Sequence, residues 1–184
     1  MPDGRITQLT AAATLALVDD LAAVYRATFT LSPHDETEGD IARFTGEMLP
    51  RHATRRDFRC CVARAAPDGG PVIGFVYGYT GEPGQYWHDL VARALDPATA
   101  AAWLPGAFEV VTLAVVPARR GRGLGAALLA AVLAELPNPT ALLSTKRMET
   151  SALNLYRTRG WATLGAPLRF PGSQTEYLVM GKRL

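Results

Sequence analysis

The sequence predicts a single α/β domain, built on a mixed and mostly antiparallel sheet of about six or seven strands with helices on both faces. The apolar, valine-rich run from Phe108 to Val116 is typical of a strand buried on both faces. A helix of strong helix formers follows over 126–136, and a short apolar strand follows over 141–145. Because two strands joined by one helix form a βαβ unit, we expect a parallel pair at the centre of the sheet.

Length and composition indicate one globular domain over residues 1–184. The chain has 184 residues, of which 48% are hydrophobic and 20% charged, and its net charge of +2 is too small to indicate nucleic-acid binding. Cys60 and Cys61 are adjacent, and the three histidines lack metal-ligand spacing. Neither a disulfide framework nor a metal site is therefore expected.

The sequence predicts neither a leader nor a membrane span. Residues 1–4 are polar and lack the basic region of a signal peptide. The longest apolar run, 126–134, is far too short to cross a bilayer. We therefore expect a soluble, cytoplasmic protein that binds no membrane and no nucleic acid.

Two helices and a hairpin are predicted before the central strand. Apolar residues at three-to-four spacing predict an amphipathic helix over 11–29, and a second helix over 39–49 should end at Pro50. Apolar runs over 58–65 and 72–80, on either side of a turn, predict two antiparallel strands.

The other connections are predicted from glycine and proline. Residues 67–70 form the hairpin turn, and 81–107 form an insertion with one or two short helices over 86–104, interrupted near Pro97. The remaining predicted elements are a helix over 152–159, which Thr150 or Ser151 can cap, and strands over 161–164 and 176–182.

The turn after the central strand has the composition of an anion site. Residues 119–125 hold three arginines and three alternating glycines. Glycine lets the backbone approach a ligand closely, and the helix that follows begins with unpaired N–H groups and a partial positive charge. Phosphate is therefore the expected anion.

This turn resembles the acetyl-CoA-binding motif of the GNAT superfamily of N-acetyltransferases. Arg120, Gly123 and Gly125 match the motif Arg/Gln-x-x-Gly-x-Gly/Ala. The segment ALNLYRTRGW over 152–161 is similar to the family's A-x-x-L-Y-x-x-x-G-F, and the order of elements is also the family's. The resemblance implies an acceptor side with its insertion over 1–107, and an acetyl-CoA-binding and catalytic half over 108–184.

The resemblance also implies which residues bind acetyl-CoA, the expected co-substrate. The pantetheine arm would pair with the central strand at Leu113, Ala114 and Val115, as another strand would. Backbone amides of the turn would grip the pyrophosphate, and these belong to Arg120, Gly121, Arg122, Gly123, Leu124, Gly125 and Ala126.

Two residues are candidates for proton transfer. In the family, a tyrosine placed as Tyr156 protonates the departing CoA thiolate, and an ordinary tyrosine, with a pKa of about 10, is protonated at neutral pH. The alternative is an aromatic residue packed on the helix face. Glu109 is the candidate base for the amine, and its alternative is a strand end facing water. Glu149 stands where the family usually has Asn, so the chain departs from the family's pattern at a position that contacts CoA there.

The predicted activity is transfer of an acetyl group from acetyl-CoA to a primary amine by direct attack, because no Ser or Cys nucleophile site is evident. One alternative is a non-catalytic acyl-CoA-binding or regulatory module of the same fold. Another is an NADP-binding protein, because Gly121, Gly123 and Ala126 also fit a relaxed dinucleotide fingerprint. Residues 117–120 argue against it, since they separate the strand from the glycines.

The acceptor is the least defined part of the prediction. The acidic loop over 35–40 could attract a cationic amine, or could serve only as helix caps and solvated charge. A small-molecule amine and a peptide amine both stay open, as does a homodimer, which the family often forms. A further cluster could line the acceptor pocket or be local packing: Tyr79, Glu82, Tyr86, Trp87 and His88.

Overall fold

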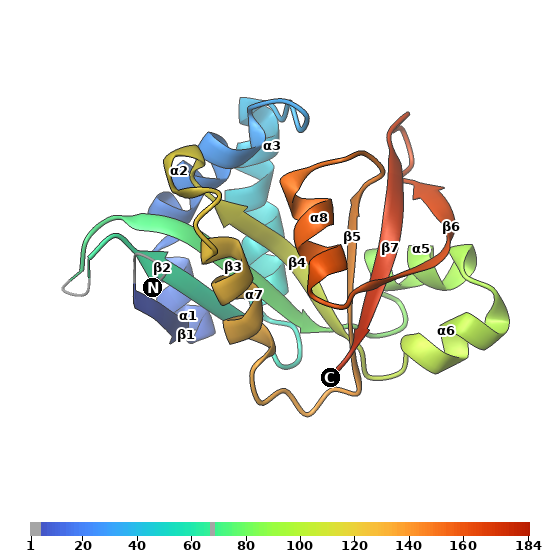
Figure 1. The fold of residues 1–184 in the computed structure, drawn as a ribbon. Helices are drawn as coiled ribbons and strands as arrows, with labels where there is room; N and C mark the ends of the chain where they lie inside the picture. The colour runs from blue at the N-terminus through green and yellow to red at the C-terminus, as the bar shows by residue number, and fades with distance from the viewer. Residues whose placement is uncertain (1–4, 67–68) are drawn as a thin grey trace. The chain divides into compact units, whose positions relative to one another are not determined.

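The computed structural model describes residues 5–66 and 69–184 (Figure 1). Its strands are β1 (Arg5–Leu9), β2 (Arg59–Arg64), β3 (Val72–Thr80), β4 (Phe108–Val115), β5 (Thr140–Lys146), β6 (Ala162–Arg169) and β7 (Glu176–Arg183). They form one seven-stranded sheet in the order β1-β2-β3-β4-β5-β7-β6. β4 and β5 run parallel, whereas β1–β2, β2–β3, β5–β7 and β6–β7 are antiparallel. The predicted mixed, mostly antiparallel sheet with a parallel βαβ unit is confirmed.

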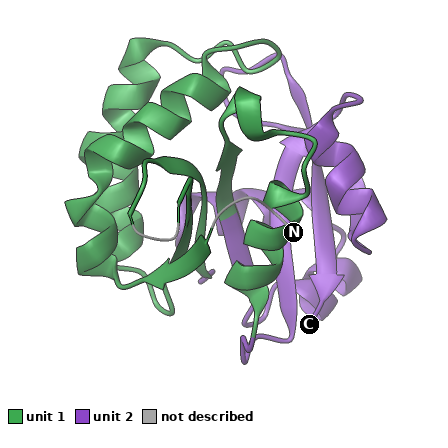
Figure 2. Cartoon of the chain, turned by 60° about the vertical axis from the view of Figure 1, so that its left-hand side comes forward, with its two compact units in different colours: residues 1–79, 111–134 green, residues 80–110, 135–184 purple. Residues whose placement is uncertain are grey.

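The described chain divides into two compact units (Figure 2). Unit 1 holds the residues up to Tyr79 together with Val111–Ala134, and unit 2 holds Thr80–Val110 and Glu135–Leu184. The boundary crosses β4, so this strand contributes residues to both units. Within the described residues, no helix is long and apolar enough to span a membrane.

Unit 1 packs helices on both faces of its strands. One face is covered by helices from the first third of the chain, and Phe44, Phe75 and Tyr77 are fully buried there. The other face carries α7, whose Leu128 lies against Gly74 of β3. The helices of this unit are α1 (Ala11–Ala16), α2 (Val18–Phe29), α3 (Glu38–Arg43), the π-helical turn η1 (Phe44–Met48), α4 (Leu49–Ala53), the 3₁₀ turn η2 (Pro117–Arg119) and α7 (Leu124–Leu133).

Two predictions for unit 1 were wrong in detail, and one strand was not predicted. The expected helix over 11–29 is two helices, because Leu17 leaves the helical region with φ −104° and ψ 16°. The second helical segment passes Pro50 and ends at Ala53. The π-helical turn over Phe44–Met48 lies directly before the proline, where Leu49 N–H donates to the Phe44 carbonyl five residues back. β1 was not predicted, and it pairs with β2 as an exposed strand. The predicted hairpin is confirmed; part of its turn, 67–68, lies outside the described residues.

Unit 2 has its own core. Val91, Leu142 and Val179 lie at its centre and are almost completely buried. Its helices are α5 (Tyr86–Ala94), α6 (Pro97–Trp103) and α8 (Ser151–Thr158). The predicted interruption near Pro97 is confirmed, because α6 begins there. β6 continues to Arg169, beyond the predicted strand over 161–164, with an irregular register against β7.

Candidate functional site

The turn before α7 has the backbone that its glycines predict. Gly121 and Gly123 have φ angles of 73° and 80°, in the left-handed region that other residues avoid. The first α7 hydrogen bond runs from Ala127 N–H to the Gly123 carbonyl. By helix geometry, the N–H groups of the three residues between them have no acceptor within the helix. These are Leu124, Gly125 and Ala126, three members of the predicted pyrophosphate set.

Arg120 has a structural use that the sequence did not indicate. Its Nε donates to the Val115 carbonyl at 3.0 Å, and its Nη2 donates to the Thr28 carbonyl at 3.3 Å. The guanidinium therefore ties the turn to the end of β4 and to α2. A fixed charge near the turn is present, but it is anchored on backbone oxygens.

At the end of β4, one edge of the strand faces β3 and the other faces away from it. Val116 N–H donates to the Ile73 carbonyl at 3.0 Å, so the peptide of Val116 faces β3. Successive residues of a strand direct their peptide groups to opposite edges. By this alternation Ala114 also faces β3, whereas Leu113 and Val115 face away from it. In the predicted pantetheine set, Leu113 and Val115 are thus the two with the outward-facing backbone.

Glu109 is buried in unit 2, with 3% of its surface exposed, so it is not a strand end facing water. It pairs in parallel register with Leu142 of β5. A Cβ built on Gly81 would lie 2.1 Å from Glu109 Oε1, so the carboxylate lies directly against the Gly81 backbone. The absence of a side chain at Gly81 makes room for the carboxylate.

β4 contains one more residue than β3 over the segment where they pair. Hydrogen bonds link Gly81 N–H to the Ala107 carbonyl and Val116 N–H to the Ile73 carbonyl. Between these bonds there are nine residue steps along β4 and eight along β3. An extra residue in one strand is a β-bulge, which shifts side-chain alternation by one. Because of this bulge, counting every second residue does not tell whether the side chain of Glu109 lies on the same face of the sheet as the side chains at the end of β4.

Tyr156 lies on α8, which Thr150 caps by accepting from Leu153 N–H. It is 7% exposed, and its ring meets Trp161 edge-on with centroids 5.8 Å apart. Burial raises the pKa of Tyr156 to about 12, because the phenolate would lose its hydration. The phenol is thus protonated at neutral pH, as an acid requires.

The other predicted site residues are dispersed. Glu149 is exposed and pairs with Arg157 at 2.8 Å. In the acidic loop, Asp40 forms a capping box with Thr37, and Glu38 forms two 2.8 Å hydrogen bonds with Arg26. Capping and solvated ion pairs therefore account for these two acidic residues.

The cluster around the insertion lies in both units. Tyr79, in unit 1, packs its ring beside His52 at 5.0 Å. In unit 2, Trp87 Nε1 donates to Ser144 Oγ at 3.1 Å, and His88 Nδ1 lies 3.2 Å from Asp89 Oδ1. Tyr86 is 61% exposed.

Gln85, the residue before α5, is buried next to this cluster. Its side-chain Nε2 donates to Glu82 Oε2 at 3.4 Å. A glutamine before a helix carries no signal for a site, so only its burial reveals it.

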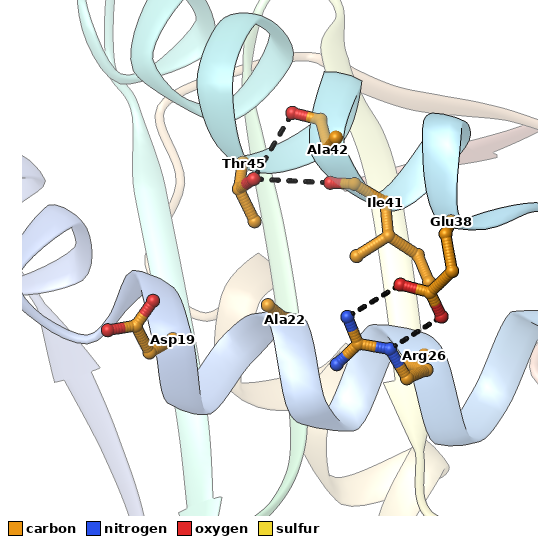
Figure 3. A pocket seen from close by; sticks show the side chains of 7 residues that line it. All are labelled: Asp19, Ala22, Arg26, Glu38, Ile41, Ala42 and Thr45. Atoms are coloured by element: carbon orange, nitrogen blue, oxygen red, sulfur yellow. Dashed lines mark hydrogen bonds and ion pairs between the residues drawn. The ribbon is translucent and has the colours of Figure 1, made fainter.

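A separate hollow of about 320 Å³ lies in unit 1 between α2 and the α3–η1 segment (Figure 3). The Arg26–Glu38 ion pair lines it, and Thr45 Oγ1 donates to the carbonyls of Ile41 and Ala42. These polar groups find their partners within the wall. No set of three His, Cys, Asp or Glu side chains suited to a metal occurs in residues 5–66 and 69–184.

The acetyltransferase (GNAT) family model matches residues 17–161. The chain belongs to this family. It is 32% identical over 140 residues to the GCN5-like protein acetyltransferase Rv2170 of Mycobacterium tuberculosis, covering 72% of this chain and 68% of that protein. The resemblance stated from the two motifs is therefore confirmed.

Solved structures show the same fold. The PaiA N-acetyltransferase of Thermoplasma acidophilum, solved with coenzyme A, matches with a TM-score of 0.65 and 14% identity over 98% of this chain and 99% of that one. Arabidopsis thaliana NAA60 with a bisubstrate analogue matches with a TM-score of 0.61 and 17% identity over 97% and 98%. At such identities the likeness concerns the fold alone.

Proposed function

We propose that this GNAT family member transfers an acetyl group from acetyl-CoA to a primary amine. The observation that carries the proposal is the turn before α7, where two left-handed glycines precede three helix N–H groups that have no acceptor within the helix. Such a turn is suited to a pyrophosphate, because N–H groups and the helix dipole both favour negative charge.

In this proposal, different residues bind different parts of acetyl-CoA. The backbone over 120–126 binds the pyrophosphate, and the outward-facing edge at Leu113 and Val115 pairs with the amides of pantetheine. Ala114 contributes through its small, fully buried side chain, since its backbone faces β3. Acetyl-CoA supplies the acyl thioester, and no metal is invoked.

The chemistry proceeds by direct attack. The amine nitrogen adds to the thioester carbonyl carbon, and the tetrahedral intermediate collapses with cleavage of the C–S bond. Tyr156 gives its phenolic proton to the departing thiolate, and Glu109 accepts a proton from the amine. The buried, protonated phenol and the buried carboxylate support these two roles.

Release of free CoA thiol tests the proposal. The protein is mixed with acetyl-CoA and a panel of small amines and peptides, and products are identified by mass spectrometry. An acetylated amine, with turnover strongly reduced in Tyr156→Phe, is expected. Tight acetyl-CoA binding with no acetylated product from any acceptor would instead favour a non-catalytic acyl-CoA-binding module.

A further inference from the structure

We propose that Trp161 is a positioning residue, which holds the phenol ring of Tyr156 in the orientation that proton donation requires. It does so by closing the end of α8 and by packing its own ring against that of the tyrosine. This inference rests on the proposed acetyltransferase function, in which Tyr156 is the acid. Both residues belong to unit 2.

The end of α8 fixes the backbone of Trp161 relative to that of Tyr156. The helix ends at Thr158, and Gly160 has a φ of 79° in the left-handed region. Trp161 N–H donates to the Tyr156 carbonyl at 3.1 Å, and Gly160 N–H donates to the Arg157 carbonyl at 3.3 Å. These two bonds form a Schellman motif, in which the left-handed residue turns the chain back over the last helical turn.

The two side chains meet across this motif. Their ring centroids are 5.8 Å apart and the ring planes cross at 61°. Tyr156 is 7% exposed and Trp161 is 4% exposed, so both rings are buried. An edge-to-face pair is a preferred and directional arrangement of two aromatic rings. A phenol that turned about its side-chain bonds would therefore lose this contact.

Packing, rather than hydrogen bonding, restrains both rings. Burial is the only cause of the raised pKa of Tyr156, so no hydrogen bond within the described chain contributes to it. The buried Nε1 of Trp161 has no hydrogen-bond partner among residues 5–66 and 69–184. What Trp161 contributes to the pair is therefore a flat, rigid ring, and another aromatic residue could supply one without loss of a hydrogen bond.

The orientation of the phenol matters because proton transfer is short-ranged. A general acid has to come within about 2.6–3.2 Å of the atom that it protonates. A misplacement of about 1 Å can lower a rate about 10²-fold. A residue that restrains the Tyr156 ring should therefore act on turnover and not on the binding of acetyl-CoA.

Steady-state kinetics separate these two effects, with acetyl-CoA and the amine or peptide from the panel above that the parent acetylates fastest. Trp161→Leu removes the flat ring and should lower kcat about ten- to a hundredfold, with the KM for acetyl-CoA within about twofold of the parent's. Trp161→Phe keeps a ring, so its kcat should stay within about threefold. The matched control is Trp103→Leu, at a tryptophan that packs over Gly181 of β7, and it should turn over as the parent does.

The same substitution in the Tyr156→Phe background tests whether Trp161 acts through the phenol. If it does, Trp161→Leu should change the remaining kcat by less than about twofold, because the group that it positions is already absent. A tryptophan that supports only the fold would instead lower kcat by the same factor in both backgrounds, and this result would contradict the proposal.

The mobility of the Tyr156 ring can be measured without turnover. The six tyrosines are replaced by 3-fluorotyrosine, and the Tyr156 signal is the fluorine signal that Tyr156→Phe lacks. Its transverse relaxation should be that of a rigid ring in the parent and in Trp161→Phe. It should be slower in Trp161→Leu, because the ring then moves on the ps–ns timescale. Unchanged relaxation in folded Trp161→Leu would overturn the positioning role.

Trp161→Met replaces Trp161→Leu in each of these measurements if circular dichroism shows that the leucine variant does not fold. Methionine fills irregular space with a flexible chain and provides no flat ring. The same loss of kcat and the same slower relaxation are therefore expected from it.

The outcomes distinguish this proposal from the proposed function. If the parent acetylates no acceptor, the function fails, and the relaxation measurement alone decides whether Trp161 holds the ring. If Tyr156→Phe turns over as the parent does, acetyl transfer stands, but the acid role and the positioning role both fail. If only Trp161→Leu behaves as the parent does, the acid role stands and the positioning role fails.

Discussion

Replacing Gly81 with alanine should force the Glu109 carboxylate out of its position. The added Cβ would lie 2.1 Å from Oε1, 2.7 Å from Cδ and 2.9 Å from Cγ of Glu109. Glu109 is 3% exposed, so its carboxylate cannot move away without displacing neighbours. Overpacking of this kind costs about 1–3 kcal/mol. For a domain of this size, each kcal/mol lowers the melting temperature by about 2–4 °C.

The effect of Gly81→Ala on the free energy of unfolding should change sign when the Glu109 side chain is removed. In Glu109→Ala the three crowding atoms are absent, and the φ of Gly81 lies outside the left-handed region, so alanine fits its backbone. Gly81→Ala should then stabilise the protein by about 0.4–1 kcal/mol, because alanine reduces the freedom of the unfolded chain. The coupling energy between the two substitutions should therefore be about 1–4 kcal/mol.

Urea unfolding of the parent, both single variants and the double variant measures this coupling. Gly46→Ala is the control: a Cβ there meets nothing within 4 Å, and it lies in a helical turn where alanine is favoured. It should stabilise by about 0.5–1 kcal/mol with or without Glu109. If Gly81→Ala costs the same in both backgrounds, within about 0.5 kcal/mol, the inferred contact is wrong.

Three further predictions test the site and the core. Tyr156→Phe should lower kcat about 10²–10⁴-fold and leave acetyl-CoA affinity by calorimetry within about twofold; unchanged turnover would exclude the acid role. Gly123→Ala puts a methyl group on a residue with φ 80°. Urea unfolding should show that the free energy of unfolding falls by about 1–2 kcal/mol, and calorimetry should show weaker binding of acetyl-CoA. Burial lowers the pKa of His52 from 6.5 to about 4, so below pH 6.5 the unfolded chain binds a proton that the folded chain does not. The free energy of unfolding should therefore be constant with respect to His52 above pH 6.5 and fall by up to about 3 kcal/mol towards pH 4. Urea titrations of His52→Gln should show a smaller fall over this range.

The parts of the fold that could be predicted depend on local rules. The hairpin of β2 and β3, the βαβ unit and the cap of α8 follow from apolar runs, turn residues and a threonine before a helix. β1 could not be predicted, because Arg5–Leu9 is largely exposed and carries no apolar alternation. Its strand character comes from pairing with β2, which is a tertiary effect.

The same distinction applies to the candidate site. The left-handed glycines of the turn and the helical place of Tyr156 were readable from residue types and spacing. Gly81 was readable only as a loop residue, and Gln85 gave no signal at all. Their significance comes from what folding brings next to them, namely the Glu109 carboxylate and Glu82.

The bonds of Arg120 bear on the pyrophosphate site that we propose at the turn. A free arginine would contribute charge but would lose side-chain entropy when it closed on a ligand. Here Nε and one Nη2 hydrogen are held by the Val115 and Thr28 carbonyls. A guanidinium has five N–H donors, so three are not used in these two bonds. Arg120 thus fixes the turn relative to β4 and α2 within the folded chain. If the turn binds a pyrophosphate, as we propose, part of the cost of ordering its backbone N–H groups is then already met in folding.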